Sequence, residues 1–270
     1  MNRIEAMFAA KREKGERALI TYTMGGDPDL SLSLKIIKTL AEAGADLIEI
    51  GLPFSDPLAD GPVIQKAGQR ALSNGVGPEE ILELVAAARR ELDLPLVIMT
   101  YLNPVFSFGV EKFFQRAAAA GADGLIIPDL PVEEGEEVAE KAAAFGLDLI
   151  PLVAPTTGPK RLEKILRQAR GFVYCVSVTG VTGMRERLPE EAVELLQRVR
   201  ATTHLPVCLG FGISRPEQAR EAVPYCDGVI VGSALVKIVE DYAQGSISRE
   251  NMLKLLAERT TALKKALGGA

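Results

Sequence analysis

Histidine and tryptophan are almost absent from this chain of 270 residues, which has one histidine and no tryptophan. The histidine, His204, stands just before a predicted strand, and we interpret it as a structural or surface residue. One histidine and no closely spaced cysteine pair argue against a transition-metal site, although carboxylates could still hold Mg²⁺. We expect no metal and no cofactor.

Long runs of one residue class are also missing. No run of lysine or arginine exceeds a pair and the net charge is -5, so nucleic acid is excluded as the main partner because its phosphates need a basic face. No apolar stretch approaches the roughly 18 residues of a membrane span, and the polar N-terminus is unlike a signal peptide. Cys175, Cys208 and Cys226 are odd in number and read as buried free thiols. We expect a cytoplasmic protein that binds no membrane.

Eight short runs rich in β-branched residues are the main positive signal, and segments with apolar residues three or four apart separate them. The runs are almost continuously apolar, which is typical of a parallel sheet covered on both faces. The predicted strands are Ala18–Thr23, Leu47–Ile50, Leu96–Tyr101, Gly124–Ile127, Asp148–Val153, Phe172–Val176, Pro206–Gly210 and Gly228–Val231. The predicted helices include Leu30–Ala43, Glu79–Leu92, Glu111–Ala120, Glu133–Phe145, Pro159–Gln168, Glu190–Arg200 and Arg215–Val223.

A repeated junction marks where helices turn into strands. Ala-Gly-Ala-Asp occurs at 43–46 and 120–123, and Phe-Gly-Leu-Asp occurs at 145–148, with each glycine suited to a left-handed helix cap. Eight such units favour a single (β/α)₈ TIM barrel domain over residues 1–270, rather than a doubly wound sheet. Additional helices are expected at about Arg3–Arg12 and Arg249–Leu267. The stretch Leu52–Gly77 is predicted to be a long functional loop.

Two acidic residues are the candidate catalytic groups. Glu49 interrupts the apolar strand Leu47–Gly51, and strand alternation places it on the same face as Leu47. The alternative is an interior salt bridge, but the other predicted strand cores contain no lysine or arginine. Burial would raise the pKa of Glu49, as a proton donor near neutral pH requires. Asp60, in the loop after the same strand, is either a second functional acid at this rim or a turn residue.

Glycines follow the last three predicted strands, in Thr179–Gly183, Gly210–Ser214 and Gly232–Leu235. Barrels commonly bind phosphate after strands seven and eight, where backbone N–H groups and a helix N-terminus attract an anion. Tight turns alone are the competing explanation. Because no lysine lies within a strand, a Schiff-base mechanism lacks its nucleophile. Carboxylate acid–base chemistry on a phosphorylated small molecule remains.

A set of motifs spread over nearly the whole chain matches one known protein family. The fourteen residues Ile48–Gly61 carry the most specific part of the likeness. The other matching motifs, in order, are Gly26–Pro28, Tyr101–Pro104, Pro128–Pro131, Ala154–Thr157, Gly180–Gly183, Gly210–Ile213 and Gly232–Val236. On these motifs the chain resembles the tryptophan synthase α subunit family. The resemblance implies a lyase that splits indole-3-glycerol phosphate, by a retro-aldol reaction, into indole and glyceraldehyde 3-phosphate.

The resemblance also implies a role for each site residue. Glu49 would be the acid–base, and Asp60 would bind the indole N–H and stabilise developing positive charge. The indole pocket would be lined by Tyr22, Met99, Tyr101, Ile126 and Tyr174. The phosphate would contact Gly183, Gly212, Gly232 and Ser233 beside Phe211, and Thr182 would order the aspartate loop.

The resemblance further implies a pyridoxal-phosphate β subunit as partner in an αββα complex. The Pro-rich rim segments Pro53–Pro57, Asn103–Phe108 and Asp129–Val132 would either dock that partner or fold inward over the barrel. Three alternatives stay open: another phosphate-binding barrel enzyme, a stand-alone indole-releasing lyase, and an α chain that only activates its partner. Intact Glu49 and Asp60 argue against the last of these.

Overall fold

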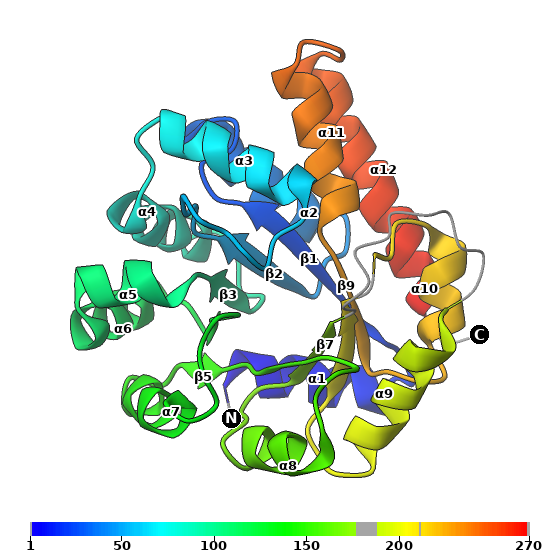
Figure 1. Cartoon of the computed structure of the whole chain (residues 1–270). Helices are drawn as coiled ribbons and strands as arrows, with labels where there is room; N and C mark the ends of the chain where they lie inside the picture. The colour runs from blue at the N-terminus through cyan, green and yellow to red at the C-terminus, as the bar shows by residue number, and fades with distance from the viewer. Residues whose placement is uncertain (1, 177–187, 211, 269–270) are drawn as a thin grey trace.

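The computed structural model describes residues 2–176, 188–210 and 212–268, and it shows parallel strands curled around one axis (Figure 1). In these residues the sheet has nine strand segments in the order β5-β4-β3-β2-β1-β9-β8-β7-β6. The segments are β1 (Ala18–Met24), β2 (Leu47–Gly51), β3 (Leu96–Met99), β4 (Gly124–Ile126), β5 (Asp148–Leu149), β6 (Leu152–Val153), β7 (Val173–Val176), β8 (Val207–Gly210) and β9 (Gly228–Val231).

The segments β5 and β6 are the two ends of one predicted strand, interrupted at Ile150 and Pro151. The amide of Ile150 donates to Leu125 on one side (2.9 Å), and Pro151 accepts from Tyr174 on the other (3.0 Å). The interrupted strand therefore joins β4 to β7 and closes the barrel. Because proline has no N–H to donate, it breaks the regular ladder at this point. The predicted (β/α)₈ barrel is confirmed.

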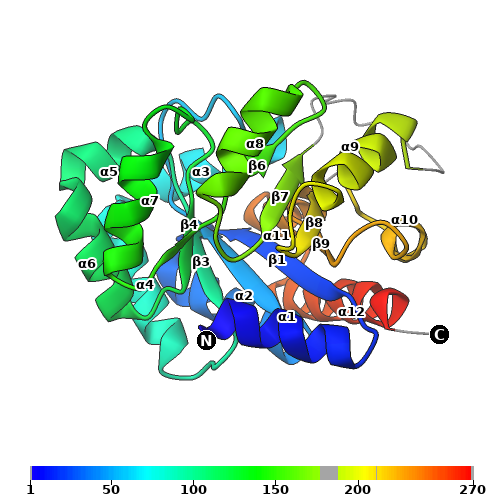
Figure 2. The same ribbon diagram turned by 90° about the horizontal axis from the view of Figure 1, so that it is seen from below.

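Helices surround the strands (Figure 2). Their bounds are α1 (Arg3–Glu13), α2 (Leu30–Glu42), α3 (Pro62–Ser73), α4 (Pro78–Arg89), α5 (Leu102–Phe108), α6 (Val110–Ala120), α7 (Gly135–Ala144), α8 (Pro159–Arg167), α9 (Glu190–Arg200), α10 (Pro216–Ala222), α11 (Ser233–Ala243) and α12 (Arg249–Leu267). The expected additional helices at both ends are present as α1 and α12. None of the helices in the described part of the chain is long and apolar enough to cross a bilayer.

A separate cluster of apolar side chains fills the inside of the barrel. Its strand residues include Ile20 and Leu47, and α1 supplies Ile4 and Phe8. The ring of Phe8 lies 5.7 Å from that of Phe172, centroid to centroid. Helix α1 therefore covers the N-terminal end of the barrel with apolar side chains. The C-terminal end is the one that remains available for a functional site.

The prediction that Leu52–Gly77 is one long loop is wrong, because α3 occupies Pro62–Ser73. The buried face of α3 consists of Ile64, Ala67, Gly68 and Ala71. These residues have helical spacing, but three of them are too small to give a strong apolar signal. The short helix α5 was also missed, because the prediction placed Tyr101 at the end of a strand and read the residues after it as a rim loop.

The glycines of the repeated junctions have the left-handed conformation that was predicted, with φ of 105° at Gly44, 89° at Gly121 and 78° at Gly146. Three aspartates directly before strands, two of them in these junctions and the third at Asp227, have a role the sequence did not reveal. Asp123 accepts the amide of Leu96 on the preceding strand (2.9 Å). Asp46 accepts Leu19 in the same way (2.7 Å), and Asp227 accepts Val207 (2.9 Å). Each carboxylate ties the start of its strand to the neighbouring strand.

Asp123→Ala should destabilise the barrel by about 2–4 kcal/mol, because it leaves the buried amide of Leu96 without its acceptor and removes the carboxylate that pairs with Arg89. Asp123 is 5% exposed and lies 2.6 Å from the Arg89 guanidinium. The measurement is the free energy of unfolding from urea titration. Asp93→Ala, at an exposed position, is the control and should stay within about 0.5 kcal/mol. Equal effects of the two substitutions would contradict the role of Asp123.

Candidate active site

Glu49 is the middle residue of strand β2. Strand pairing sets it opposite Tyr22 of β1 and Val97 of β3. Its inward orientation follows from the pleat, because Leu47 belongs to the interior cluster while Ile48 and Ile50 pack against the helices. The predicted face of Glu49 is therefore confirmed.

The carboxyl of Glu49 is fully buried, and neither oxygen has a hydrogen-bond partner among the described residues. Burial raises its pKa to about 8 because the charged form would lose its hydration without compensation. The group is therefore mainly protonated at neutral pH. In this part of the chain no cation pairs with it, so the alternative of an interior salt bridge fails.

Asp60 lies in the loop between β2 and α3, where its side chain is half-buried. Burial raises its pKa to about 6, and a hydrogen bond from the Tyr101 hydroxyl opposes part of that rise. The same hydroxyl accepts the amide of Ala59 at 3.0 Å, so Tyr101 holds the loop and its carboxylate together. At pH 7 Asp60 is mainly ionised while Glu49 is mainly neutral. Two carboxyls with separated pKa values can serve as acid and anion in one site.

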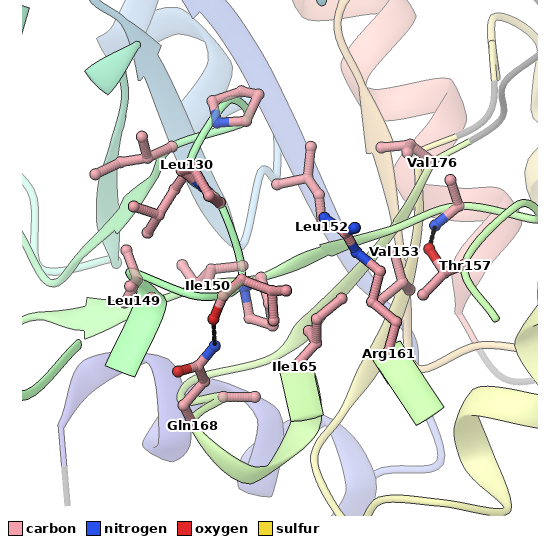
Figure 3. A pocket seen from close by; sticks show the side chains of 18 of the residues that line it. Leu130, Leu149, Ile150, Leu152, Val153, Thr157, Arg161, Ile165, Gln168 and Val176 are labelled. Carbon is pink, nitrogen blue, oxygen red and sulfur yellow. Dashed lines mark hydrogen bonds between the residues drawn. The ribbon is translucent and has the colours of Figure 1, made fainter. Parts of the chain in front are cut away.

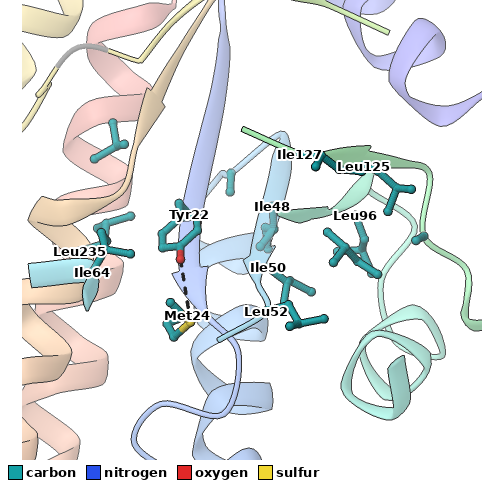
Figure 4. Packing of buried hydrophobic residues seen from close by; sticks show 14 of the residues in the cluster. Tyr22, Met24, Ile48, Ile50, Leu52, Ile64, Leu96, Leu125, Ile127 and Leu235 are labelled. Carbon is teal, nitrogen blue, oxygen red and sulfur yellow. Dashed lines mark hydrogen bonds between the residues drawn. The ribbon is translucent and has the colours of Figure 1, made fainter. Parts of the chain in front are cut away.

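Tyr22 and Tyr174 lie close enough to Glu49 and Asp60 for the charges of these acids to affect their pKa values. Burial is the main reason that their pKa values are raised, and the charges of Asp60 and Glu49 add to the rise in each. The Tyr22 hydroxyl donates to the Met24 sulfur at 3.9 Å, and the pair lies against the packed side chains shown in Figure 4. Phenol rings therefore form two walls of the space that Glu49 faces.

These two tyrosines pack directly against glycines, which have no side chain to displace them. A Cβ at Gly51 would stand 2.2 Å from the Tyr22 hydroxyl, and one at Gly210 would stand 2.2 Å from the Tyr174 ring. No larger residue fits without displacing the ring. Gly51 was not predicted as a site residue, although its position two residues after Glu49 on the inward face was a usable signal.

Met99 and Ile126 lie side by side, since the two residues are partners in the register of β3 and β4. Both belong to the interior cluster, as does Leu152 of β6, which the sequence analysis did not select. Leu152 is the register partner of Tyr174, so it completes the apolar wall between β4 and β7. The interior cluster thus joins Met99, Ile126 and Tyr174. Tyr22 lies near both Tyr101 and Tyr174, which contribute to the rise in its pKa, so the structure brings the five predicted pocket residues to one region.

The predicted anion site is only partly within the described residues. Gly232 caps α11 without a side-chain hydrogen bond, and the amides of Leu235 and Val236 donate back to its carbonyl (2.8 and 3.0 Å). Among the described residues no acceptor is present for the backbone amides of Ser233 and Ala234. Gly212 has φ of 51° and open space around its Cβ position. Thr182, Gly183 and Phe211 lie outside the described residues.

A cavity of about 440 Å³ opens beside the break between β5 and β6. Figure 3 shows it between the loop after β4, with Leu130, and helix α8, with Arg161 and Ile165. Its lining includes Leu152 and also Ala59, the neighbour of Asp60, but neither carboxyl. The cavity adjoins the apolar wall of the site and does not contain the chemical groups.

The site therefore combines a neutral buried acid, an ionised carboxylate, an apolar pocket between phenol rings, and an exposed helix N-terminus. A helix N-terminus favours anions, and a protonated carboxyl can donate a proton. Within the described residues no three His, Cys, Asp or Glu side chains gather as metal ligands. The arrangement suits proton transfer to an apolar ring whose tail carries a phosphate.

Comparisons with known proteins point in one direction. The model of the family described as tryptophan synthase alpha chain matches residues 8–267. The tryptophan synthase alpha chain of Carboxydothermus hydrogenoformans is 68% identical over 264 residues, which cover 98% of this chain and 99% of the relative. That of Microcystis aeruginosa is 47% identical over 268 residues, covering 99% of this chain and 100% of the relative.

Solved structures agree. A chain of Mycobacterium tuberculosis tryptophan synthase is similar with a TM-score of 0.90 and 38% identity, covering 100% of this chain and 99% of that one. Tryptophan synthase subunit alpha from Legionella pneumophila is similar with a TM-score of 0.89 and 34% identity, covering 99% of this chain and 98% of that one. Both likenesses span the whole barrel.

Glu49→Gln should stabilise the protein increasingly as the pH rises from 6 to 8. The raised pKa means that the folded state holds a proton that the unfolded state has lost, so wild-type stability falls as pH rises toward about 8. Glutamine does not titrate, and the difference in unfolding free energy should grow by about 1.4 kcal/mol per pH unit.

Glu137→Gln is the control for this stability measurement. Lys141 lowers the pKa of Glu137, so its carboxyl stays ionised above pH 6 in both states. Its effect should therefore not change with pH. Parallel pH curves for the Glu49→Gln variant and wild type would mean that Glu49 is not buried as a neutral acid.

Proposed function

The chain belongs to the tryptophan synthase alpha chain family, and we propose that Glu49 and Asp60 carry out its lyase reaction at the barrel mouth. The α reaction of this family splits indole-3-glycerol phosphate into indole and glyceraldehyde 3-phosphate. The observation that carries the proposal is the buried carboxyl of Glu49, which has no hydrogen-bond partner in the described part of the chain and holds its proton at neutral pH. We also take residues 1–270 as one domain, because β1 near one end pairs with β9 near the other.

The bond to be broken joins C3 of the indole ring to the glycerol chain. Its electrons need an acceptor, and protonation of C3 by Glu49 turns the ring into that acceptor. The positive charge that develops spreads to the ring nitrogen, where the Asp60 carboxylate would accept the N–H hydrogen bond. Electrostatic stabilisation of this kind is worth a few kcal/mol, on the order of 10²–10³ in rate.

The second half of the reaction returns the proton. The Glu49 carboxylate left by the first step takes the proton of the glycerol hydroxyl beside the breaking bond, and that carbon becomes the aldehyde. The bond's electrons return to the ring, which becomes indole, and Glu49 ends protonated as it began. The balance needs no metal, lysine or oxidant.

Binding would place the substrate's two ends on the two kinds of surface that the barrel mouth offers. The indole would lie in the pocket of Tyr22, Met99, Tyr101, Ile126 and Tyr174, with Leu152 added to its wall. The phosphate would meet the amides at Gly232 and Ser233 and the open backbone at Gly212. From the resemblance we also propose that Gly183 and Phe211 contact the phosphate and that Thr182 orders the Asp60 loop.

An alpha chain implies a β-subunit partner, and we propose the αββα arrangement for the complex. Part of the predicted rim folds inward, since the ring of Phe54 lies 5.4 Å from that of Tyr101. Other side chains point to solvent: Leu58 is 95% exposed and Phe106 is 53% exposed. Exposed apolar residues beside the site suit a docking surface, so we assign docking to these outward residues.

Glu49→Gln should lower kcat for indole release from indole-3-glycerol phosphate by about 10²–10⁴, because it removes the proton donor and leaves its shape. Binding of glycerol 3-phosphate should be kept. The wild-type rate should be bell-shaped in pH, falling below about 6, where Asp60 is protonated, and above about 8, where Glu49 is ionised. Normal turnover by Glu49→Gln would refute the assignment.

Phe106→Asp should weaken activation by the β subunit at least about tenfold in apparent affinity, because it places a charge on the docking surface. The measurement is indole release by a fixed amount of the variant as the β subunit is titrated. Leu255→Asp, at an apolar residue on α12 that is 41% exposed, is the matched control. Indole release without the β subunit should be unchanged in both. If the two variants respond alike, docking at Phe106 is wrong.

A further inference from the structure

Helix α3 directly follows the loop that carries Asp60, and only Gly61 separates them. The Gln65 side chain on α3 donates to the backbone carbonyl of Asp60 at 2.9 Å. The amide of Gln65 also donates to the Gly61 carbonyl at 3.0 Å, which closes the first turn of the helix. The position of the Asp60 carboxylate therefore depends on where α3 sits on the barrel.

The far end of α3 is fixed by a buried ion pair. Arg70 forms two hydrogen bonds to the Asp27 carboxylate, both 2.8 Å long, and the Asp27 side chain is 2% exposed. Asn74, which caps the helix, donates to the carbonyl of Pro28 at 2.6 Å. A bidentate pair of this kind holds orientation as well as distance. One end of α3 is thus held to the loop after β1.

The middle of α3 is tied to α11, the helix whose N-terminus forms the anion site (Figure 1). Lys66 of α3 lies 3.1 Å from one carboxylate oxygen of Glu240 on α11. The other oxygen lies 2.8 Å from Lys237, and Gln244 donates to the first at 3.2 Å. Although Glu240 carries a charge, its side chain is only 2% exposed, and the two lysines lower its pKa.

Glu240 thus pairs with two lysines, one from its own helix and one from another helix. Lys237 belongs to the same helix, three residues away, so its pairing ties α11 only to itself. Lys66 belongs to α3, so its pairing joins α3, which follows the Asp60 loop, to α11, whose N-terminus is the proposed phosphate site. Lys66 and Arg70 are four residues apart and therefore share one face of α3. That face meets both buried carboxylates, Asp27 and Glu240.

We propose that Lys66 and Glu240 are positioning residues that set the distance between the phosphate-binding end of α11 and the Asp60 carboxylate. With the substrate's phosphate held by α11, the link through α3 keeps Asp60 aligned on the other end of the same molecule. Small misplacements of a catalytic group are costly in rate. This inference rests on the proposed function, because it concerns how Asp60 meets the indole ring.

The test compares Lys66→Met with Lys237→Met in the full-length protein. Each substitution removes one positive charge from Glu240, but only the first breaks the connection between helices. Lys66→Met should lower kcat for indole release about three- to fivefold, as expected for one partly exposed ion pair, with KM within about twofold of wild type. Lys237→Met should leave both within about twofold, and Lys66→Arg should restore kcat.

A second experiment, in the Asp60→Asn variant, distinguishes an effect of Lys66 on the position of Asp60 from a general effect on stability. In Asp60→Asn, Lys66→Met should lower kcat no further, because the residue it positions has already lost its charge. Equal losses in Lys66→Met and Lys237→Met, an unchanged kcat in Lys66→Met, or an additional loss in the Asp60→Asn background would overturn the inference. Failure of the wild-type protein to release indole would refute the proposed function instead, so the two failures are distinguishable.

Discussion

The burial of one carboxyl without a partner is the constraint on which the site depends. Glu49 keeps its proton at neutral pH only because the barrel removes water and supplies no cation in the described residues. That environment needs a closed barrel, an apolar cluster beneath the carboxyl, and tyrosine rings beside it. A carboxyl at an exposed strand end would titrate near its ordinary pKa and would lose its proton before it met a substrate.

Stability and chemistry occupy opposite ends of this barrel. At the N-terminal ends of the strands, Asp46, Asp123 and Asp227 accept amides from neighbouring strands, and α1 closes the interior. These carboxylates have partners, so their charge stabilises the fold. Toward the C-terminal ends, Glu49 has no hydrogen-bond partner among the residues that the structure describes, and Asp60 is only half-buried. A carboxylate with satisfied hydrogen bonds thus stabilises the N-terminal end of the barrel, whereas Glu49, a buried carboxyl without one in the described residues, is the candidate proton donor at the other end.

Local rules account for most of what could be predicted. The strand and helix alternation, the left-handed glycines and the inward direction of Glu49 all follow from short-range pattern, and the structure confirms them. Helix α3 was not predicted because its buried face consists mainly of small residues rather than strongly apolar ones. The break at Pro151 was not predicted because the residues on both sides of it have the composition of one continuous strand. Leu152 was not predicted as a pocket residue because no feature of the nearby sequence shows that it pairs with Tyr174.

The sequence by itself determined the class of fold and the family, and it named the candidate residues for proton donation and anion binding. Those properties are written in composition, period and motif, which need no knowledge of distant contacts. Only the tertiary structure decided that Glu49 is neutral while Asp60 is charged, and that Gly51 and Gly210 are needed to seat two tyrosines. It also decided that Lys66 reaches Glu240. The physical reason is that pKa, steric fit and ion pairing depend on neighbours far along the chain, which folding alone brings within a few ångströms.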